Sequence, residues 1–181
     1  MKTEETNLYT ITVPPMMKSL KNLSGILEKL EKHAKAKQME WHPKGLQEHN
    51  LLHSHLISDQ FDFTRQIQSA SDNAKGGAAR LAGMKPPVMK DNEKTVKDLK
   101  ARIDKTIAFL KTIKPEKIIG QEARKVSLPY WKDKEMTAFG YATEYLLPNF
   151  YFHVATAYSI LRKNGVDIGK SDFLGAMPFV K

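Results

Sequence analysis

Residues 147–169 of this 181-residue chain read LPNFYFHVATAYSILRKNGVDIG. Apolar side chains recur in this segment at three- and four-residue steps, which is the spacing of one face of an α-helix. They are Phe150, Val154, Ala157 and Leu161. Asn149 and His153 lie four residues apart on a strip beside that face. The segment therefore predicts a helix with a polar pair next to its core-facing stripe, ending where Gly165 suits the left-handed position after a helix.

Three other segments have the same amphipathic spacing and predict three more long helices. The expected bounds of the four helices are about 15–37, after a proline pair, then 59–83, 92–115 and 140–164. A short helix is also expected over residues 46–53, inside the connection between the first and second long helices. Four long amphipathic helices joined in this way are typical of a four-helix bundle.

Between the third and fourth long helices the apolar period changes. Residues 123–138 alternate apolar and polar side chains about a polar turn at 132–134, so we expect a small β-hairpin there. Pro129 limits it to an edge or irregular strand. The tail after Gly165 is expected to pack back as an extended segment. We thus predict an all-α fold, a four-helix bundle with one small hairpin, as a single domain over residues 1–181.

The adjacent glycines Gly76 and Gly77 fall inside the second predicted helix. Each glycine costs a helix roughly 1 kcal/mol relative to alanine. A close approach of another helix at this point is the expected compensation. The chain has neither a G-x-x-x-x-G-K-[ST] nor a G-x-G-x-x-G pattern, so the common phosphate-binding loops are excluded.

Composition excludes several classes of protein. There is no cysteine, which removes thiol nucleophiles, zinc–thiolate sites and disulfides. The net charge is +9, but the lysines alternate with acidic residues along the predicted helices, so no nucleic-acid partner is expected. No apolar run approaches the length of a membrane span, and the first residues lack the pattern of a secretory signal. We therefore expect a cytoplasmic protein without a membrane partner.

Two polar strips are the candidate functional site. Because bundles build sites from side chains on facing helices, we expect a pocket between the second and fourth helices. The strip on the fourth helix contains Tyr145, Asn149 and His153, and the strip on the second contains Gln68 and Asp72.

Within this pocket we assign His153 and Asp72 as catalytic residues, with His153 as a general base or metal ligand and Asp72 setting its tautomer. Asn149, Gln68 and Tyr145 are expected to bind the ligand. A purely structural alternative is an interior hydrogen-bond network in which Asp72 either holds His153 or pairs with Lys75.

A rival cluster of histidines lies in the connection after the first helix. His49 and His53 have the four-residue spacing of metal ligands on a helix, and His55 follows them. The glutamate of an H-E-x-x-H protease is absent because Asn50 follows His49. The polar surroundings and flanking helix breakers favour solvent-exposed histidines.

Three segments resemble a branch of the DinB-like (YfiT-like) superfamily that is described as a domain of unknown function. They are MKSLKNLSGILEKLEKHA, RQIQSASDNAKGGAARLAG and KEMTAFGYATEYLLPNFYFHVATAYSILRKNGVDIGKSDFLG. The resemblance extends over nearly the whole chain and implies a DinB-like four-helix bundle.

In many DinB-like proteins three histidines hold a divalent metal, commonly nickel or zinc. One lies on the second helix and two form an H-x3-H pair on the fourth. Aligned on LRKNGVDIG, this chain has His153 at the second position of that pair, Asn149 at the first, and no histidine over residues 68–72. The resemblance therefore implies an incomplete metal triad, since a neutral asparagine is a poor ligand for nickel or zinc.

Three functions follow as hypotheses. The resemblance implies a metal-dependent transferase or hydrolase that uses a thiol of the bacillithiol or glutathione type. A second hypothesis is a non-catalytic bundle that binds an apolar or acidic metabolite among the side chains Tyr145, Phe150, Tyr151 and His153. A third is an interaction module that forms a homodimer through exposed aromatics such as Tyr151 and Tyr158.

Overall fold

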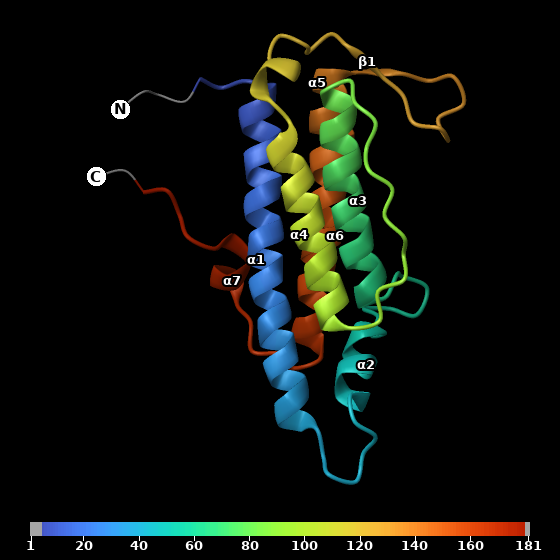
Figure 1. Ribbon diagram of the computed structural model, residues 1–181, viewed down its shortest axis with the longest axis vertical. Coiled ribbons are helices and arrows are strands. Elements are labelled where there is room, and N and C mark those ends of the chain that lie inside the picture. The colour runs from blue at the N-terminus through green and yellow to red at the C-terminus, as the bar shows by residue number, and fades with distance from the viewer. Residues whose placement is uncertain (1–4, 180–181) are drawn as a thin grey trace.

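The computed structural model describes residues 5–179 and shows four long helices packed side by side (Figure 1). These helices are α1 (Leu8–Lys37), α3 (Phe63–Leu81), α4 (Val96–Thr112) and α6 (Leu147–Lys163). The shorter elements are α2 (Leu46–Leu52), η1 (Pro115–Lys117), β1 (Lys125–Val126), β2 (Met136–Thr137), α5 (Ala138–Gly140), η2 (Tyr141–Leu146) and α7 (Lys170–Leu174). The predicted all-α bundle is confirmed. Within residues 5–179, no helix is both long and apolar enough to cross a membrane.

The first helix begins earlier than expected, and the prediction that the proline pair starts it is wrong. The Asn7 side chain accepts a hydrogen bond from the Thr10 backbone N–H, and the Thr10 hydroxyl accepts one from the Asn7 N–H, both at 3.0 Å. This reciprocal capping box begins α1 at Leu8 and places Pro14 and Pro15 inside the helix. The helix continues through the prolines because its inward face, which includes Val13, is buried.

Side-chain caps also begin α3 and α4 later than the apolar pattern suggests. The Asp62 carboxylate accepts a hydrogen bond from the Arg65 N–H at 2.8 Å, so α3 starts at Phe63 and not near residue 59. Thr95 and Asp98 form a second capping box at the start of α4. Asn92, the cap predicted from the sequence, lies in the loop before it.

The predicted hairpin is present but short. Strands β1 and β2 are two residues each and antiparallel, with Lys125 opposite Thr137 and Val126 opposite Met136. The turn between them contains two residues with positive φ, Lys132 and Asp133. The chain then leads directly into α5 and η2.

The fourth long helix is not α-helical at its start. Residues Tyr141–Leu146 form a wider π-helical turn, in which the Leu147 N–H donates to the carbonyl of Ala142. Pro148 follows in the first turn of α6, where a missing N–H is tolerated. The helix is therefore irregular just before Pro148, in the form of a π turn, an arrangement that is frequent at functional sites.

The C-terminal tail packs back on the bundle, but the prediction that it is extended is wrong over residues 170–174. These residues form α7, which lies against α1 (Figure 1). The Asn22 side-chain amide donates to the Phe173 carbonyl at 3.0 Å, and Lys29 pairs with Asp172 at 2.8 Å. Asp172 also accepts a hydrogen bond from the Gly169 N–H, which caps the short helix.

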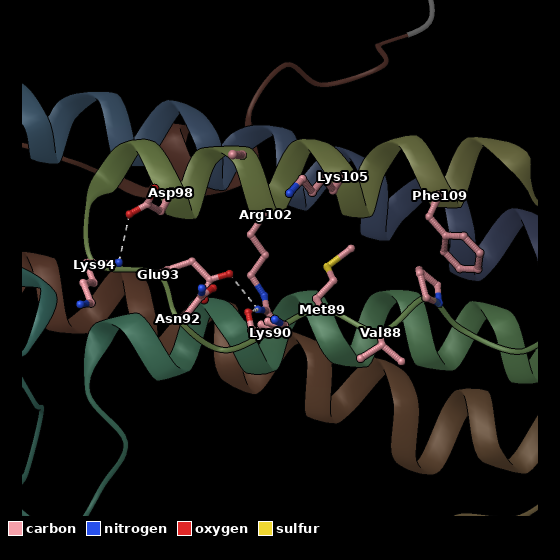
Figure 2. Close-up of a pocket in the computed structure, with 12 residues that line it drawn as sticks. Val88, Met89, Lys90, Asn92, Glu93, Lys94, Asp98, Arg102, Lys105 and Phe109 are labelled. Atoms are coloured by element: carbon pink, nitrogen blue, oxygen red, sulfur yellow. Dashed lines mark hydrogen bonds and ion pairs between the residues drawn. The ribbon is translucent and has the colours of Figure 1, made fainter.

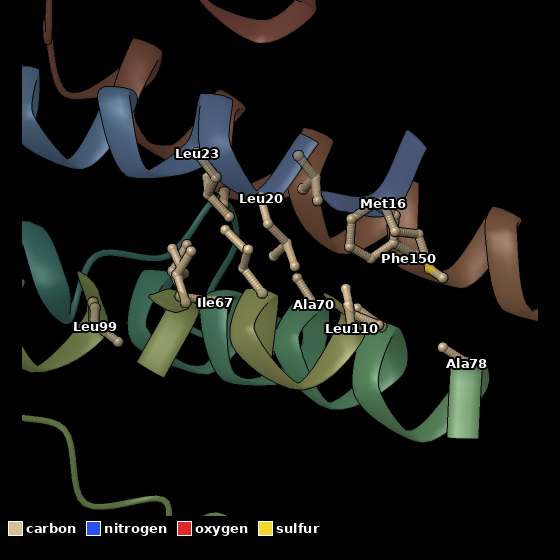
Figure 3. Packing of buried hydrophobic residues seen from close by; sticks show 14 of the residues in the cluster. Met16, Leu20, Leu23, Ile67, Ala70, Ala78, Leu99, Leu110 and Phe150 are labelled. Atoms are coloured by element: carbon tan, nitrogen blue, oxygen red, sulfur yellow. The ribbon is translucent and has the colours of Figure 1, made fainter. Parts of the chain in front are cut away.

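The core is formed by apolar side chains from all four long helices (Figure 3). Figure 3 shows side chains of neighbouring helices packing between one another, with large ones such as Leu20 opposite small ones of α3 such as Ala70. Representative members, all fully buried, are Leu20 and Leu23 of α1, Ile67 and Ala70 of α3, Leu110 of α4 and Phe150 of α6.

The glycine pair on α3 marks its closest approach to η2. A Cβ atom added at Gly77 would lie 2.1 Å from Cδ1 and 2.6 Å from Cδ2 of Leu146, which is fully buried. The Leu146 side chain therefore occupies the space that a side chain at position 77 would need. The predicted close approach is confirmed at Gly77.

This contact predicts that Gly77→Ala lowers the free energy of unfolding by about 1–3 kcal/mol, because overpacking at Leu146 outweighs the gain in helix propensity. Gly25→Ala is the matched control, since its added Cβ would have nothing within 4 Å on α1. We expect the control to raise stability by roughly 0.5–1 kcal/mol. Urea denaturation of both variants measures this, and equal effects of the two substitutions would contradict the prediction.

Candidate functional site

A cavity of about 330 Å³ lies between α3 and the continuous segment formed by η2 and α6, next to the hairpin. The cavity-lining residues from the predicted set are Asp72, Tyr145, Asn149 and His153. Gln68, the other predicted ligand-binding residue, does not line the cavity and is hydrogen-bonded to residues outside the predicted set. Its amide donates to Glu93 Oε2 at 2.9 Å and accepts from Arg65 Nη1 at 3.2 Å.

His153 lines this cavity. Its side chain is buried, and Nδ1 lies 2.7 Å from Oε1 of Gln66. The Gln66 amide nitrogen in turn donates to the Phe61 carbonyl at 3.2 Å, which orients Oε1 toward the imidazole. Because an amide oxygen only accepts, Nδ1 must carry the proton, and Nε2 keeps its lone pair. In the described chain Nε2 has no hydrogen-bond partner.

The surroundings of His153 favour the neutral ring. Burial lowers the pKa of the imidazole, and the positive charge of Arg65 lowers it further. Gln66 contributes no charge that would oppose this shift. The ring is therefore a neutral acceptor at pH 7, which is the state that a general base requires.

Asp72 does not orient His153, so the role predicted for it is wrong. Its carboxylate accepts from Nη2 of Arg102 at 2.6 Å and pairs with Nζ of Lys75 at 2.8 Å. The ion pair with Lys75 is the structural alternative that the sequence allowed. Gln66 has the orienting role instead, and no feature of the sequence distinguishes it from the other polar residues of α3.

Arg102 of α4 explains why Asp72 is unavailable. Its side chain is only 1 % exposed and lies among three carboxylates. Besides Asp72 it contacts Asp91 at 3.0 Å and Glu93 at 2.9 Å, the latter shown by a dashed line in Figure 2. Burial disfavours the charged guanidinium, but the hydrogen bond to Glu93 and the negative charges of the three acids outweigh it and raise the pKa of Arg102.

A larger cavity, of about 640 Å³, lies on the other side of this cluster, between α4 and residues 87–94 (Figure 2). Its one buried cation, Arg102, is already paired with carboxylates, and its rim is open to solvent, with Val88 95 % exposed. We favour the smaller cavity as the functional site, because it is lined by a buried imidazole whose second ring nitrogen has no hydrogen-bond partner in the described residues.

Asn149 joins α6 to α3 beside His153. Its side-chain nitrogen donates to Oδ1 of Asn73 at 2.8 Å, and the Asn73 amide donates to the Ser69 carbonyl at 2.8 Å. This chain orients the carboxamide of Asn149 and leaves its oxygen available to a ligand.

Aromatic side chains form the end of the cavity near the hairpin. Tyr141 and Tyr145 stack at 5.7 Å between ring centroids, and Trp131 packs edge-on against Tyr145 at 5.3 Å. The Tyr145 hydroxyl is hydrogen-bonded to that of Tyr130. Burial and then this hydrogen bond raise the pKa of Tyr145, so its phenol stays neutral. Tyr130 is a site residue that sequence reasoning missed, because only the fold of the hairpin brings it to α6.

The donor set does not fit the three-histidine metal site of DinB-like proteins. His153 supplies one imidazole, Asn149 supplies an amide, and Asp72 is committed to two cations. Within residues 5–179 no three His, Cys, Asp or Glu side chains are grouped to hold a metal ion. Arg65 and Arg80 also line the cavity, and their positive charges oppose a divalent cation.

The histidines His49, His53 and His55 are exposed, and His53 and His55 contact different partners. Nδ1 of His53 lies 3.1 Å from Oδ2 of Asp62, and Nδ1 of His55 lies 2.7 Å from the Gln60 carbonyl. They border the same surface hollow as His49, but no metal-binding group of three ligands is formed in the described chain.

The aromatic grouping expected around a metabolite is not formed as a unit. Phe150 is fully buried in the core, and Tyr151 faces a different hollow beside α1 and α7. Tyr158 packs edge-on against Phe173 at 5.8 Å. Only Tyr145 and His153 of that expected set line the cavity.

The lowered pKa of His153 predicts a pH-dependent stability. The unfolded chain binds a proton near pH 6.5 while the folded chain does not, so stability is present above that pH and is lost as the pH falls toward the folded-state pKa. We expect His153→Gln to flatten the fall in unfolding free energy between pH 7 and 5. His49→Gln, at an exposed site, is the control. Identical pH profiles for the parent and His153→Gln would contradict a buried neutral ring.

Comparisons with known proteins show the family and agree with the fold. Residues 8–174 match the model of the family described as Domain of unknown function (DUF1993). The crystal structure of a DinB family member from Shewanella denitrificans is 40 % identical, with a TM-score of 0.87, over 96 % of this chain and 95 % of that one. A search of curated proteins found no match. The chain therefore belongs to the DinB family, in the branch described as a domain of unknown function.

Proposed function

We propose that the chain binds a small polar ligand in the cavity between α3 and α6, and that His153 acts on it as a general base through Nε2. The observation that carries this proposal is the hydrogen bond of 2.7 Å between Nδ1 of His153 and Gln66, in a buried site that keeps the ring neutral. An imidazole with one nitrogen oriented and the other free is arranged to accept a proton. The cavity is lined by Asn149 and His153, the two positions at which the resemblance to DinB-like proteins implies a metal site.

The other predicted residues have supporting roles in this proposal. Asn149 and Tyr145 line the cavity with a carboxamide and a neutral phenol, which can hydrogen-bond a polar ligand. Asp72 makes no hydrogen bond to the base within the described residues, since its carboxylate pairs with Arg102 of α4, which joins α3 to α4, and with Lys75 within α3. It is a positioning residue in this scheme and does not take part in proton transfer.

A screen of small organic acids, alcohols and amines by thermal shift tests the proposal. A compound present at 100 times its Kd stabilises the fold by about 2.7 kcal/mol, which is about 5–10 °C for a chain of this length. We expect the shift to disappear in His153→Gln and to persist in His49→Gln. A ligand that stabilises the parent and His153→Gln equally would show that binding does not involve this ring.

The alternative of a metal-dependent thiol transferase or hydrolase has weaker support. His153 offers one imidazole to a metal, whereas Asn149 is a poor ligand and Asp72 is paired with two cations. Calorimetry with nickel, zinc and manganese is expected to give no tight binding by the parent. Asn149→His would add an imidazole four residues before His153, and we expect it to raise nickel or zinc affinity at least about tenfold. Micromolar binding by the parent that is lost in His153→Ala would support the metal function instead.

A further inference from the structure

Arg80 is the unpaired cation of the cavity. Its guanidinium lines the end near the hairpin together with Tyr130 and Tyr141. Arg65, the other arginine in the lining, pairs with Asp91. Within residues 5–179 no carboxylate lies in ion-pair distance of Arg80. The one acid that lines the cavity, Asp72, is already paired with two other cations.

The second glycine of α3 explains how Arg80 takes this position. Gly76 lies one helical turn before Arg80, and a Cβ atom there would lie 2.7 Å from Nη1 of Arg80. The guanidinium therefore folds back over a backbone position that has no side chain. The two adjacent glycines thus have different roles, since Gly77 admits Leu146 and Gly76 admits Arg80.

Three tyrosines line the cavity together with Arg80. Tyr130 and Tyr145 share one hydrogen bond between their hydroxyls, so one of the two O–H groups remains free to donate. Burial raises the pKa of Tyr141, which keeps this third phenol protonated as a donor beside Arg80. A guanidinium with neighbouring O–H donors is the combination that binds carboxylate or phosphate oxygens.

We infer that Arg80 and the hydroxyls of Tyr130 and Tyr141 form an oxyanion-binding subsite at the hairpin end of the cavity. The ligand is then a small molecule that carries a carboxylate or a phosphate at this end and presents its reacting group to Nε2 of His153. This inference rests on the proposed function and names the class of its ligand. A volume of about 330 Å³ is at the lower limit of small-molecule sites and suits a compact ligand.

The chain contains a suitable optical reporter. It has two tryptophans, and Trp41 is exposed in the loop after α1 while Trp131 packs against Tyr145 and Tyr141 at 5.3 and 6.1 Å. In a Trp41→Phe background, the emission of Trp131 alone reports on the subsite. The probes are benzoate and phenyl phosphate, which distinguish the two kinds of oxyanion, with benzamide as the neutral analogue of benzoate.

We expect at least one of the two anions to change the emission of Trp131 saturably, and benzamide to bind at least about tenfold more weakly than benzoate if benzoate binds. Arg80→Gln should weaken anion binding at least about tenfold, as expected for loss of a charged hydrogen bond. Arg162→Gln removes the same charge from an exposed position at the end of α6 and should leave the affinity unchanged.

Gly76→Ala gives a second test that keeps Arg80 in the chain. The added methyl group displaces the flexible end of the arginine, while alanine improves the helix by up to about 1 kcal/mol. We expect weaker anion binding together with an unchanged or higher Tm. A purely structural role for Gly76 would not lower affinity without lowering stability.

The inference is overturned if neither anion gives a saturable response, if benzamide binds as tightly as benzoate, or if Arg80→Gln keeps the parent affinity. His153→Gln separates this inference from the proposed function. Anion binding that is weakened in Arg80→Gln but unchanged in His153→Gln would retain the subsite and show that it binds anions without the ring of His153. Binding that is lost in His153→Gln but kept in Arg80→Gln would reject the subsite and retain the base.

Discussion

The contact between Gly77 of α3 and Leu146 of η2 sets the distance on which the rest of the bundle depends. Because Gly77 has no side chain, the two segments approach closely enough for their polar strips to meet further along the helices. The meeting points are the hydrogen bonds from Asn149 to Asn73 and between His153 and Gln66, at 2.8 and 2.7 Å. A wider spacing would separate both pairs, and it would leave the buried Gln66 without its partner at a cost of about 1–3 kcal/mol.

Charge pairing then decides which polar groups remain available to a ligand. Arg102 is buried on α4 and forms ion pairs with three carboxylates, those of Asp72 on α3 and of Asp91 and Glu93 in the segment before α4. The carboxylate that would otherwise face the cavity is neutralised by this arrangement. What remains in the lining is the neutral imidazole of His153 and the guanidinium of Arg80, on which the proposal of an anionic ligand rests.

The sequence predicted the helices well and their first residues poorly. Apolar stripes with three- and four-residue spacing indicated all four long helices, because that pattern depends only on burying one face. The first residues were predicted wrongly because a capping side chain, and not the apolar spacing, fixes where each of these helices begins. Asn7 begins α1 before the proline pair, Asp62 begins α3, and Thr95 rather than Asn92 begins α4. The helix α7 was missed because five residues are too few for a periodic signal.

For the site, local spacing on α6 was enough to predict that Tyr145, Asn149 and His153 share a strip, and all three line the cavity. Their partners could not be predicted from spacing. Only the packing of α3 and the hairpin against α6 brings Gln66 to His153, and Tyr130 and Arg80 to the cavity. The sequence by itself determined the amphipathic helices and the glycine pair that allows them to approach. Only the tertiary structure decided that Gln66 and not Asp72 orients His153, because the choice depends on Arg102, a buried charge that needs the carboxylate of Asp72 more than a neutral ring does.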